Sequence, residues 1–203
     1  ACANPACDET DRKADHNPPI GALYDTHRLT CGCGSRVLDL IVCEVCGEVF
    51  LGGYKPPDGP ADSYILTPDQ PDLENMPDRM ITQRTCSDYS IFWPTPHESM
   101  EPLQIEWQVD KIKRRWKRAT LDPITGALDI NARQQTTTTE IHGWVYAVIG
   151  NSDKAKRQPA YPTRCPRCDA DYRYRDNNPT PLRNHRTGFS KACQVLAGGL
   201  ARE

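Results

Sequence analysis

The ten cysteines of this 203-residue chain are the feature that most constrains its fold, because eight of them fall into four close pairs. The pairs are Cys2/Cys7, Cys31/Cys33, Cys43/Cys46 and Cys165/Cys168. A structural zinc ion takes four ligands in a tetrahedron, with each sulfur about 2.3 Å from the metal. The Cys-x-x-Cys-Gly and Cys-Pro-x-Cys forms are typical of zinc knuckles and zinc ribbons, whereas Cys-x-Cys and Cys-x4-Cys are weaker signals alone. Four pairs of thiolates therefore predict two structural zinc ions.

The chain between the second and third pairs indicates which pairs share an ion. Residues 35–42 (SRVLDLIV) are rich in aliphatic residues and contain no turn residue, which predicts a strand. An extended chain from Cys33 to Cys43 would separate those pairs by roughly 30 Å, too far for one ion. We therefore expect Cys2/Cys7 to join Cys31/Cys33, and Cys43/Cys46 to join Cys165/Cys168.

The composition supports a metal-stapled fold. Only 37% of residues are hydrophobic and 7% aromatic, with 18 prolines, so apolar burial alone is a weak source of stability. Disulfides are the alternative staple, but they need an oxidising compartment. Residues 1–5 lack the features of a signal peptide, and no apolar run approaches the ~20 residues of a membrane helix. We expect a cytoplasmic protein with no membrane partner and, because the chain opens without an initiator methionine, a piece of a longer one.

A catalytic zinc is the functional alternative to a structural one. It needs three protein ligands and an open position, whereas four thiolates close the site. His16 and His27 lie near the first two pairs in sequence, and replacement of a cysteine by one of them stays open. The chain has no phosphate-binding loop, Asp-Glu-x-x box, nucleophile elbow or His-Glu-x-x-His motif, so we expect no catalytic residue and no enzyme activity in it. Cys86 and Cys193 receive no function.

The remaining pattern predicts short strands and one helix. Residues 90–93 and 143–149 read as strands, and residues 111–121 and 127–130 as a hairpin around the Pro123-x-x-Gly126 turn. Residues 150–163 read as a polar linker, and a 3.6-residue apolar period from Phe189 to Leu200 predicts a helix carrying Cys193. The expected fold is a β-rich α+β module with short antiparallel strands, long irregular loops and one C-terminal helix. Within residues 1–203 we expect zinc knuckles at 1–54 and 164–180, a β-rich insertion with proline-rich loops at 55–163, and a basic segment with the helix at 181–203.

A basic cluster is the best local candidate for contacts with nucleic acid. It comprises Lys111, Lys113, Arg114, Arg115, Trp116, Lys117 and Arg118. Such a cluster suits contact with phosphates. The alternative is the solvated face of a hairpin, and both readings stay open because the chain has 25 basic against 27 acidic residues. A second basic stretch, from Arg164 to Lys191, is interleaved with aspartates, which favours a solvated surface.

The chain resembles a region of large bacterial DEAD/DEAH-type superfamily 2 helicases, including those of anti-phage defence systems. The matching stretches are residues 1–7 (ACANPAC), 31–38 (CGCGSRVL), 43–53 (CEVCGEVFLGG), 165–168 (CPRC), 181–189 (PLRNHRTGF) and 194–196 (QVL). The resemblance implies an accessory module beside two RecA-like motor domains, with ATP binding and hydrolysis in other parts of the parent protein. It also implies that residues 111–118, or arginines such as Arg183 and Arg186, face DNA. Only the eight paired cysteines carry over, as zinc ligands.

The expected function is therefore that of a non-catalytic zinc-binding module of an ATP-dependent DNA helicase, which shapes the nucleic-acid path or links the motor domains. Its expected partners are DNA and those motor domains. The alternative is a zinc-organised protein-interaction module that recruits a subunit of a bacterial defence or repair complex. The proline-rich segments 55–80 and 94–102 and the near-neutral charge favour this alternative.

Overall fold

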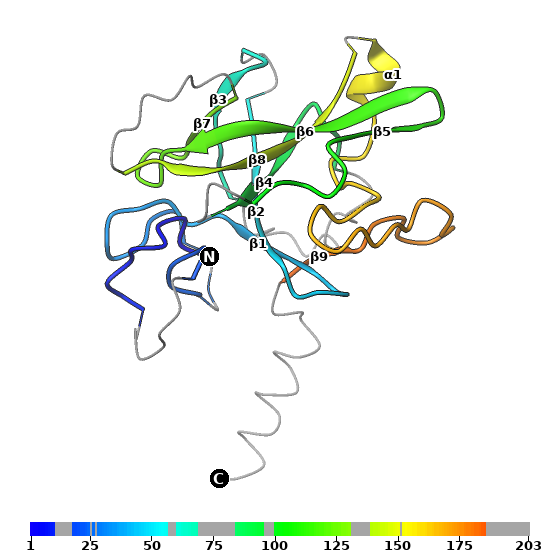
Figure 1. The fold of residues 1–203 in the computed structure, drawn as a ribbon. Coiled ribbons are helices and arrows are strands. Elements are labelled where there is room, and N and C mark those ends of the chain that lie inside the picture. Colours follow the sequence, from blue (N-terminus) through cyan, green and yellow to red (C-terminus); the bar gives the residue numbers. More distant parts are fainter. Residues whose placement is uncertain are drawn as a thin grey trace, which may run out of the picture.

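The computed structural model of the protein describes residues 1–10, 18–24, 26, 28–56, 60–68, 84–95, 100–130, 139–150 and 152–185. A nine-stranded antiparallel sheet forms its centre (Figure 1). The strands lie in the order β3-β7-β6-β8-β4-β2-β1-β9, and β5 pairs with β6 beside this path. The strands are β1 (Asp39–Cys43), β2 (Val49–Tyr54), β3 (Ser63–Ile65), β4 (Tyr89–Pro94), β5 (Glu106–Val109), β6 (Ile112–Leu121), β7 (Ala127–Asp129), β8 (Ile141–Val148) and β9 (Leu182–Asn184).

This architecture confirms the expected β-rich α+β fold. The hairpin expected around Pro123 and Gly126 is present as β6 and β7, and Gly126 has the positive φ of 78° that its turn requires. A second tight hairpin joins β5 to β6, where Asp110 and Lys111 both have positive φ. That conformation is typical of a two-residue turn whose twist matches the strands on either side.

The prediction that residues 150–163 form a polar linker was wrong. They contain a short helix, α1 (Asp153–Lys156), capped by the Ser152 hydroxyl, which accepts a hydrogen bond from the amide of Ala155. Ala160 and Tyr161 from the same stretch are buried in the core rather than exposed in a linker. The expected C-terminal helix, Cys193 and Arg186 lie outside the described residues. Among the helices of the described part, none is long and apolar enough to cross a membrane.

Both faces of the sheet are buried, because successive side chains of a strand point to opposite faces. We call one face the tryptophan face: it carries Trp93, Trp116, Trp144, Phe50 and Tyr89, and Cys165 and Leu182 pack on it from the C-terminal part of the chain. We call the other the aliphatic face: it carries Leu38, Leu51, Phe92, Leu121 and Val145, and the N-terminal residues Ala3 and Ile20 cover it. The N-terminal segment and the segment around Cys165 thus pack on opposite faces of one sheet.

A buried charged pair locks the tryptophan face. The Arg84 side chain is 2% exposed and lies 3.5 Å from a carboxylate oxygen of Asp39, and it donates a hydrogen bond to the Tyr161 hydroxyl. The Tyr89 hydroxyl donates to the same carboxylate at 2.8 Å. Gly52 permits this contact, because a Cβ at that position would collide with the Tyr89 hydroxyl.

We predict that Arg84→Met destabilises the protein by about 3 kcal/mol, because it removes the ion pair of a buried arginine with Asp39 and its hydrogen bond to Tyr161. Urea unfolding followed by circular dichroism measures this loss. The matched control is Arg118→Met, which removes an exposed ion pair with Glu101 and should cost less than about 1 kcal/mol. Equal losses in the two variants would contradict the structural role of Arg84.

Candidate metal centres

The structure brings the eight paired cysteines together in two groups of four. The first cysteine group is Cys2, Cys7, Cys31 and Cys33, and the second cysteine group is Cys43, Cys46, Cys165 and Cys168. Within each group all ligand atoms lie within 4.8 Å of one another, so each group could hold a metal ion. These are the two sets that the chain length between Cys33 and Cys43 predicts. His16 and His27 lie outside the described residues.

The sulfur–sulfur distances fit a tetrahedral metal site. The Sγ atoms are 3.7 Å apart in Cys2–Cys33, 3.5 Å in Cys7–Cys31, 3.9 Å in Cys43–Cys168 and 3.8 Å in Cys46–Cys165. A tetrahedron with metal–sulfur bonds of 2.3 Å has an edge of about 3.8 Å. A disulfide bond would need about 2.05 Å, so these cysteines are free thiols in the structure. Four soft thiolates with no carboxylate among them suit zinc or iron rather than calcium or magnesium.

Local turns aim the sulfurs of each group at one point. In three of the four pairs the residue after the second cysteine has positive φ: Gly34 at 84°, Gly47 at 76° and Asp169 at 61°. The amides of these residues donate to the carbonyls of Cys31, Cys43 and Cys165 respectively, which closes each turn. Glycine adopts this conformation without strain, which explains the Cys-x-x-Cys-Gly and Cys-x-Cys-Gly patterns. Asp169 holds it with the help of Arg164, whose Nε lies 2.7 Å from its carboxylate.

Burial and hydrogen bonds have opposite effects on the pKa values of the cysteine thiols. Burial raises the pKa of Cys2 well above its usual value, although the backbone of Asn4 opposes the change. Burial also acts to raise the pKa of Cys33, but hydrogen bonds from Ser35 and the neighbouring thiols outweigh it and lower that pKa to about 6. Four thiolates cannot ionise together in such a small volume without a cation to neutralise them. The donor sets therefore fit a divalent metal ion.

The two groups support opposite faces of the sheet. The first cysteine group packs with Ala22 and Val37 beside the aliphatic face, and the Tyr24 hydroxyl lies 3.0 Å from the sulfur of Cys31. In the second group, Cys43 ends β1 while Cys165 packs on the tryptophan face. In Figure 1 the N-terminal segment and the 165–180 segment lie on either side of β1 and β2.

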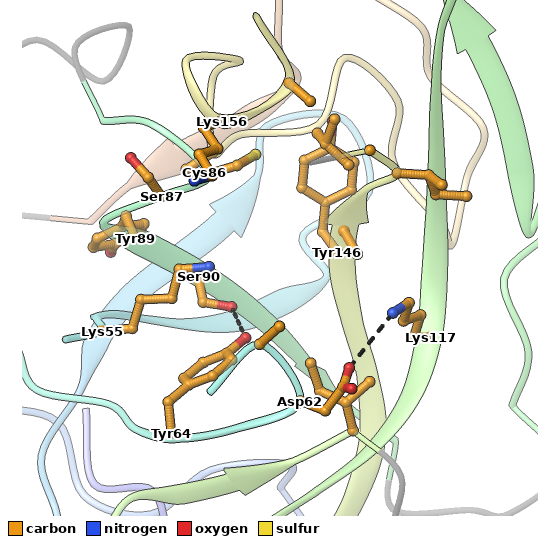
Figure 2. Close-up of a pocket in the computed structure, with 18 of the residues that line it drawn as sticks. Lys55, Asp62, Tyr64, Cys86, Ser87, Tyr89, Ser90, Lys117, Tyr146 and Lys156 are labelled. Atoms are coloured by element: carbon orange, nitrogen blue, oxygen red, sulfur yellow. Dashed lines mark hydrogen bonds and ion pairs between the residues drawn. The ribbon is translucent and has the colours of Figure 1, made fainter. Parts of the chain in front are cut away.

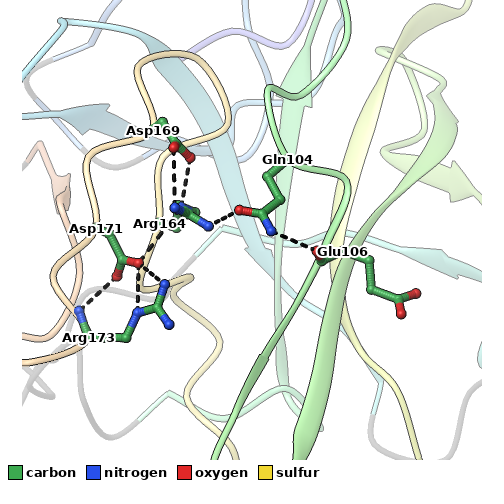
Figure 3. A network of polar contacts seen from close by, with 6 residues as sticks. All are labelled: Gln104, Glu106, Arg164, Asp169, Asp171 and Arg173. Atoms are coloured by element: carbon green, nitrogen blue, oxygen red, sulfur yellow. Dashed lines mark hydrogen bonds and ion pairs between the residues drawn. The ribbon is translucent and has the colours of Figure 1, made fainter.

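A polar network anchors the second group to the sheet (Figure 3). Arg164, the residue before Cys165, donates to Gln104 and contacts the carboxylates of Asp169 and Asp171. Asp171 also accepts hydrogen bonds from Arg173. The Gln104 amide donates to the carbonyl of Glu106 in β5. The arginines at the start of the second basic stretch are therefore paired within the fold, as the interleaved aspartates indicate.

The structure divides the basic cluster of residues 111–118. Two of its members, Arg114 and Trp116, are buried, with only 4% and 1% of their surface exposed. Their burial corrects the expectation that these two side chains contact nucleic acid. Arg114 donates to the carbonyl of Val109 and to the side chain of Gln158, and Trp116 packs in the tryptophan face. The remaining members, Lys111, Lys113, Arg115, Lys117 and Arg118, are exposed or half-buried.

Several of these exposed cations already have partners. Lys113 lies 3.4 Å from Glu106, Lys117 lies 3.8 Å from Asp62, and Arg118 lies 2.6 Å from Glu101. Arg183, in β9, lies 2.8 Å from Glu44 and donates to the carbonyl of Thr180. Exposed pairs of this kind contribute little to stability, so a phosphate can compete for the cations.

Comparison with models of known protein families identifies the family of this chain. The YjiV N-terminal domain matches residues 23–186. The chain belongs to this family. Neither a curated protein nor a solved structure matches it. The matched range contains the whole sheet and the second cysteine group, whereas Cys2 and Cys7 of the first group precede it. Since the family description names no ligand or reaction, the chemistry of the cysteine groups carries the functional argument.

Gly21 is a site residue of this family member that the spacing of cysteines did not reveal. Its amide donates to the carbonyl of Cys2, and a Cβ at this position would lie 2.5 Å from the Cβ of Cys7. The same Cβ would also collide with the carbonyl of Asn4. Gly21 therefore lets the chain pass directly behind the first cysteine group.

We predict that Gly21→Ala lowers the bound metal from two ions to about one per chain, because the new methyl group displaces Cys7. Elemental analysis of the purified protein measures this. The control is Gly34→Ala, which has no atom within 4 Å of its Cβ and costs only the strain of its positive φ, about 1–2 kcal/mol. It should keep both ions. Full metal content in Gly21→Ala would show that the packing around Cys7 is not required.

Proposed function

We propose that the chain is a non-catalytic structural zinc module, with one zinc ion in each cysteine group, that serves an ATP-dependent DNA helicase or translocase. The observation that carries the zinc proposal is the match between the Sγ separations of 3.5–3.9 Å and the edge of a tetrahedral zinc–thiolate site. Four thiolates fill the coordination sphere, so such an ion has no open position for a substrate or a reactive water. The ions would act by holding the chain together.

The second cysteine group supports a structural role most directly. It joins Cys46 to Cys165, which are 119 residues apart, and it thereby fixes both ends of the segment that contains most of the sheet. A metal that binds only the folded chain adds its binding free energy to the stability of the fold. A chain with only 37% hydrophobic residues needs such a contribution.

The helicase context rests on the resemblance of the cysteine-bearing stretches and of residues 181–189 to superfamily 2 helicases. In this proposal ATP binding and hydrolysis belong to RecA-like domains of a larger, cytoplasmic parent protein. The module would shape the DNA path or link the motor domains. The surface that we assign to DNA is the tip of the β5–β6 hairpin, where Lys111 and Lys113 are exposed. Phosphates can replace the weak partner Glu106 there.

Exposed apolar side chains favour the second candidate function, a protein-interaction module of a defence or repair complex. Val45 is 55% exposed between two cysteines of the second group, and Tyr174 is 88% exposed in the loop that follows its last cysteine. Leu103 is 68% exposed, and its amide donates to the carbonyl of Pro166 in the same group. Large apolar side chains on metal-ordered loops suit a protein partner.

We predict two zinc ions per chain in the wild type and about one in each of Cys2→Ser and Cys165→Ser, because the two groups share no ligand. Elemental analysis measures the zinc. Cys86→Ser is the control and should keep both ions, since the Cys86 sulfur contacts the carbonyl of Pro159 and belongs to neither group. A single zinc in the wild type that is lost with Cys165 but not with Cys2 would refute the proposal for the first group.

We predict that Lys111→Glu/Lys113→Glu weakens DNA binding and lowers the salt dependence of the affinity, with the slope falling by about two. Fluorescence anisotropy of labelled duplex and single-stranded DNA at several salt concentrations measures both. The matched control, Lys154→Glu/Arg157→Glu, reverses two exposed charges on and beside α1 and should have a smaller effect. No DNA binding by the wild type at low salt, together with capture of a specific protein partner, would select the interaction module instead.

A further inference from the structure

A cavity of about 770 Å³ lies where the sheet divides. β4 and β8 pair only over residues 92–94 and 143–145. Toward Tyr89 and Ser90 on one strand, and toward Tyr146 on the other, the two strands move apart, as Figure 2 shows. The cavity lies in this gap, and residues 55–56, 60–62 and 155–156 complete its walls. Its size is that of pockets that take a small organic ligand.

The lining of this cavity is strongly positive. It contains four cationic side chains, those of Lys55, Arg115, Lys117 and Lys156, against the single carboxylate of Asp62. Asp62 lies 3.8 Å from Lys117. The other three cations form no ion pair with any carboxylate in the described part of the chain. This concentration of positive charge stands out in a chain whose formal net charge is −2.

Two of these cations are held at a cost that an anion would remove. The Nε atom of Arg115 is buried and has no hydrogen-bond partner among the described residues. Lys55 places its Nζ 5.1 Å from the centre of the Tyr64 ring, and its pKa is lowered by burial, which nearby Asp88 only partly opposes. Arg84 and Arg164 also bury an Nε atom without a hydrogen-bond partner, but each lies beside a carboxylate, that of Asp39 or Asp169. A half-buried guanidinium without a carboxylate partner and a desolvated amine on one cavity suit an anionic ligand.

The rest of the lining suits a ligand that is only partly charged. The rings of Tyr64 and Tyr146 supply flat apolar walls (Figure 2). The Tyr64 hydroxyl and Ser90 are 2.9 Å apart and bond to each other, while Ser87 is exposed at the rim. Cys86 also lines the cavity, but burial raises the pKa of its thiol to about 12, so it is a protonated wall residue and no nucleophile.

We propose that this cavity binds the phosphate group of a nucleotide, with Arg115 and Lys55 as its principal donors and Lys117 and Lys156 at its mouth. Guanidinium groups donate two parallel hydrogen bonds to phosphate oxygens, and ammonium groups add point charge. The tyrosine rings then flank the sugar or base. The phosphate can come from a free nucleotide or from the end of a DNA strand, and the site is independent of the hairpin tip formed by Lys111 and Lys113.

The test is binding of defined probes to the full chain, by isothermal titration calorimetry at low salt. The probes are thymidine, thymidine 5′-monophosphate, and a short oligothymidylate with and without a 5′-phosphate. We expect the monophosphate to bind and thymidine not to bind within about 10 mM. Preference for the 5′-phosphorylated oligonucleotide over both the monophosphate and the unphosphorylated oligonucleotide would identify a strand end as the source. Equal binding of the monophosphate and the phosphorylated oligonucleotide would identify a free nucleotide.

Variants separate the cavity from general charge attraction. Lys55→Gln/Arg115→Gln should weaken binding of the monophosphate about tenfold or more. Lys111→Gln/Lys113→Gln removes the same charge at the exposed hairpin tip and should leave that affinity unchanged. Equal losses in the two double variants would overturn the proposal, as would the absence of binding by any phosphate-bearing probe.

A titration of the wild-type protein tests the site without variants, whose folding could be impaired. Amide chemical shifts recorded by NMR during titration with thymidine 5′-monophosphate should change at Lys55, Ser87, Lys117 and Gly150, which line the cavity. They should stay constant at Lys113 and at the second cysteine group. Changes confined to the hairpin tip would place the phosphate outside the cavity and refute the assignment.

Discussion

The second cysteine group is the constraint on which the rest of the structure depends. It brings the end of β1 together with Cys165 and Cys168, and strands β2 to β8 lie between these points in the sequence. Closing a chain segment of about 100 residues removes several kcal/mol of conformational entropy from the unfolded state in the chain-entropy model. With the proposed metal ion bound, the strands of that segment lie in a chain whose two ends are joined. The pairing of β9 with β1 continues the same closure, since Leu182 lies opposite Cys43.

The first cysteine group solves a different problem. The aliphatic face of the sheet would be open to water without the N-terminal segment, and residues such as Ala3 and Ile20 are small or isolated in sequence. A segment of this kind has little apolar area with which to hold itself in place. Its cysteines lie beside Cys31 and Cys33, just before β1, where the proposed metal ion would join the two segments. One short stretch of chain, residues 31–46, contributes two cysteines to each group. The segments that pack on the two faces of the sheet therefore both meet this stretch.

The sequence predicts features that follow from short-range geometry and misses those that depend on where strands part. The cysteine sets were predictable because an extended segment between Cys33 and Cys43 cannot fold back on itself. The β6–β7 hairpin was predictable because Gly126 must adopt a positive φ. In contrast, α1 is a single turn and too short for a helical period. The cavity draws its lining from separate segments, and the gap between β4 and β8 that creates it has no signature in either strand.

The basic cluster shows why a run of charge in a strand cannot be interpreted as one surface. Side chains of β6 alternate between faces, so Arg114 and Trp116 enter the core while Arg115 and Lys117 reach the cavity. Arg114 is tolerated inside because the tight turn at Asp110 and Lys111 leaves carbonyls, such as that of Val109, that its guanidinium satisfies. Lys111 and Lys113 remain at the exposed tip. These five cations therefore have three different environments. A charge reversal that spans all of them would combine loss of folding, loss of the cavity and loss of the tip, which is why Arg114 has to be left intact when the other two environments are compared.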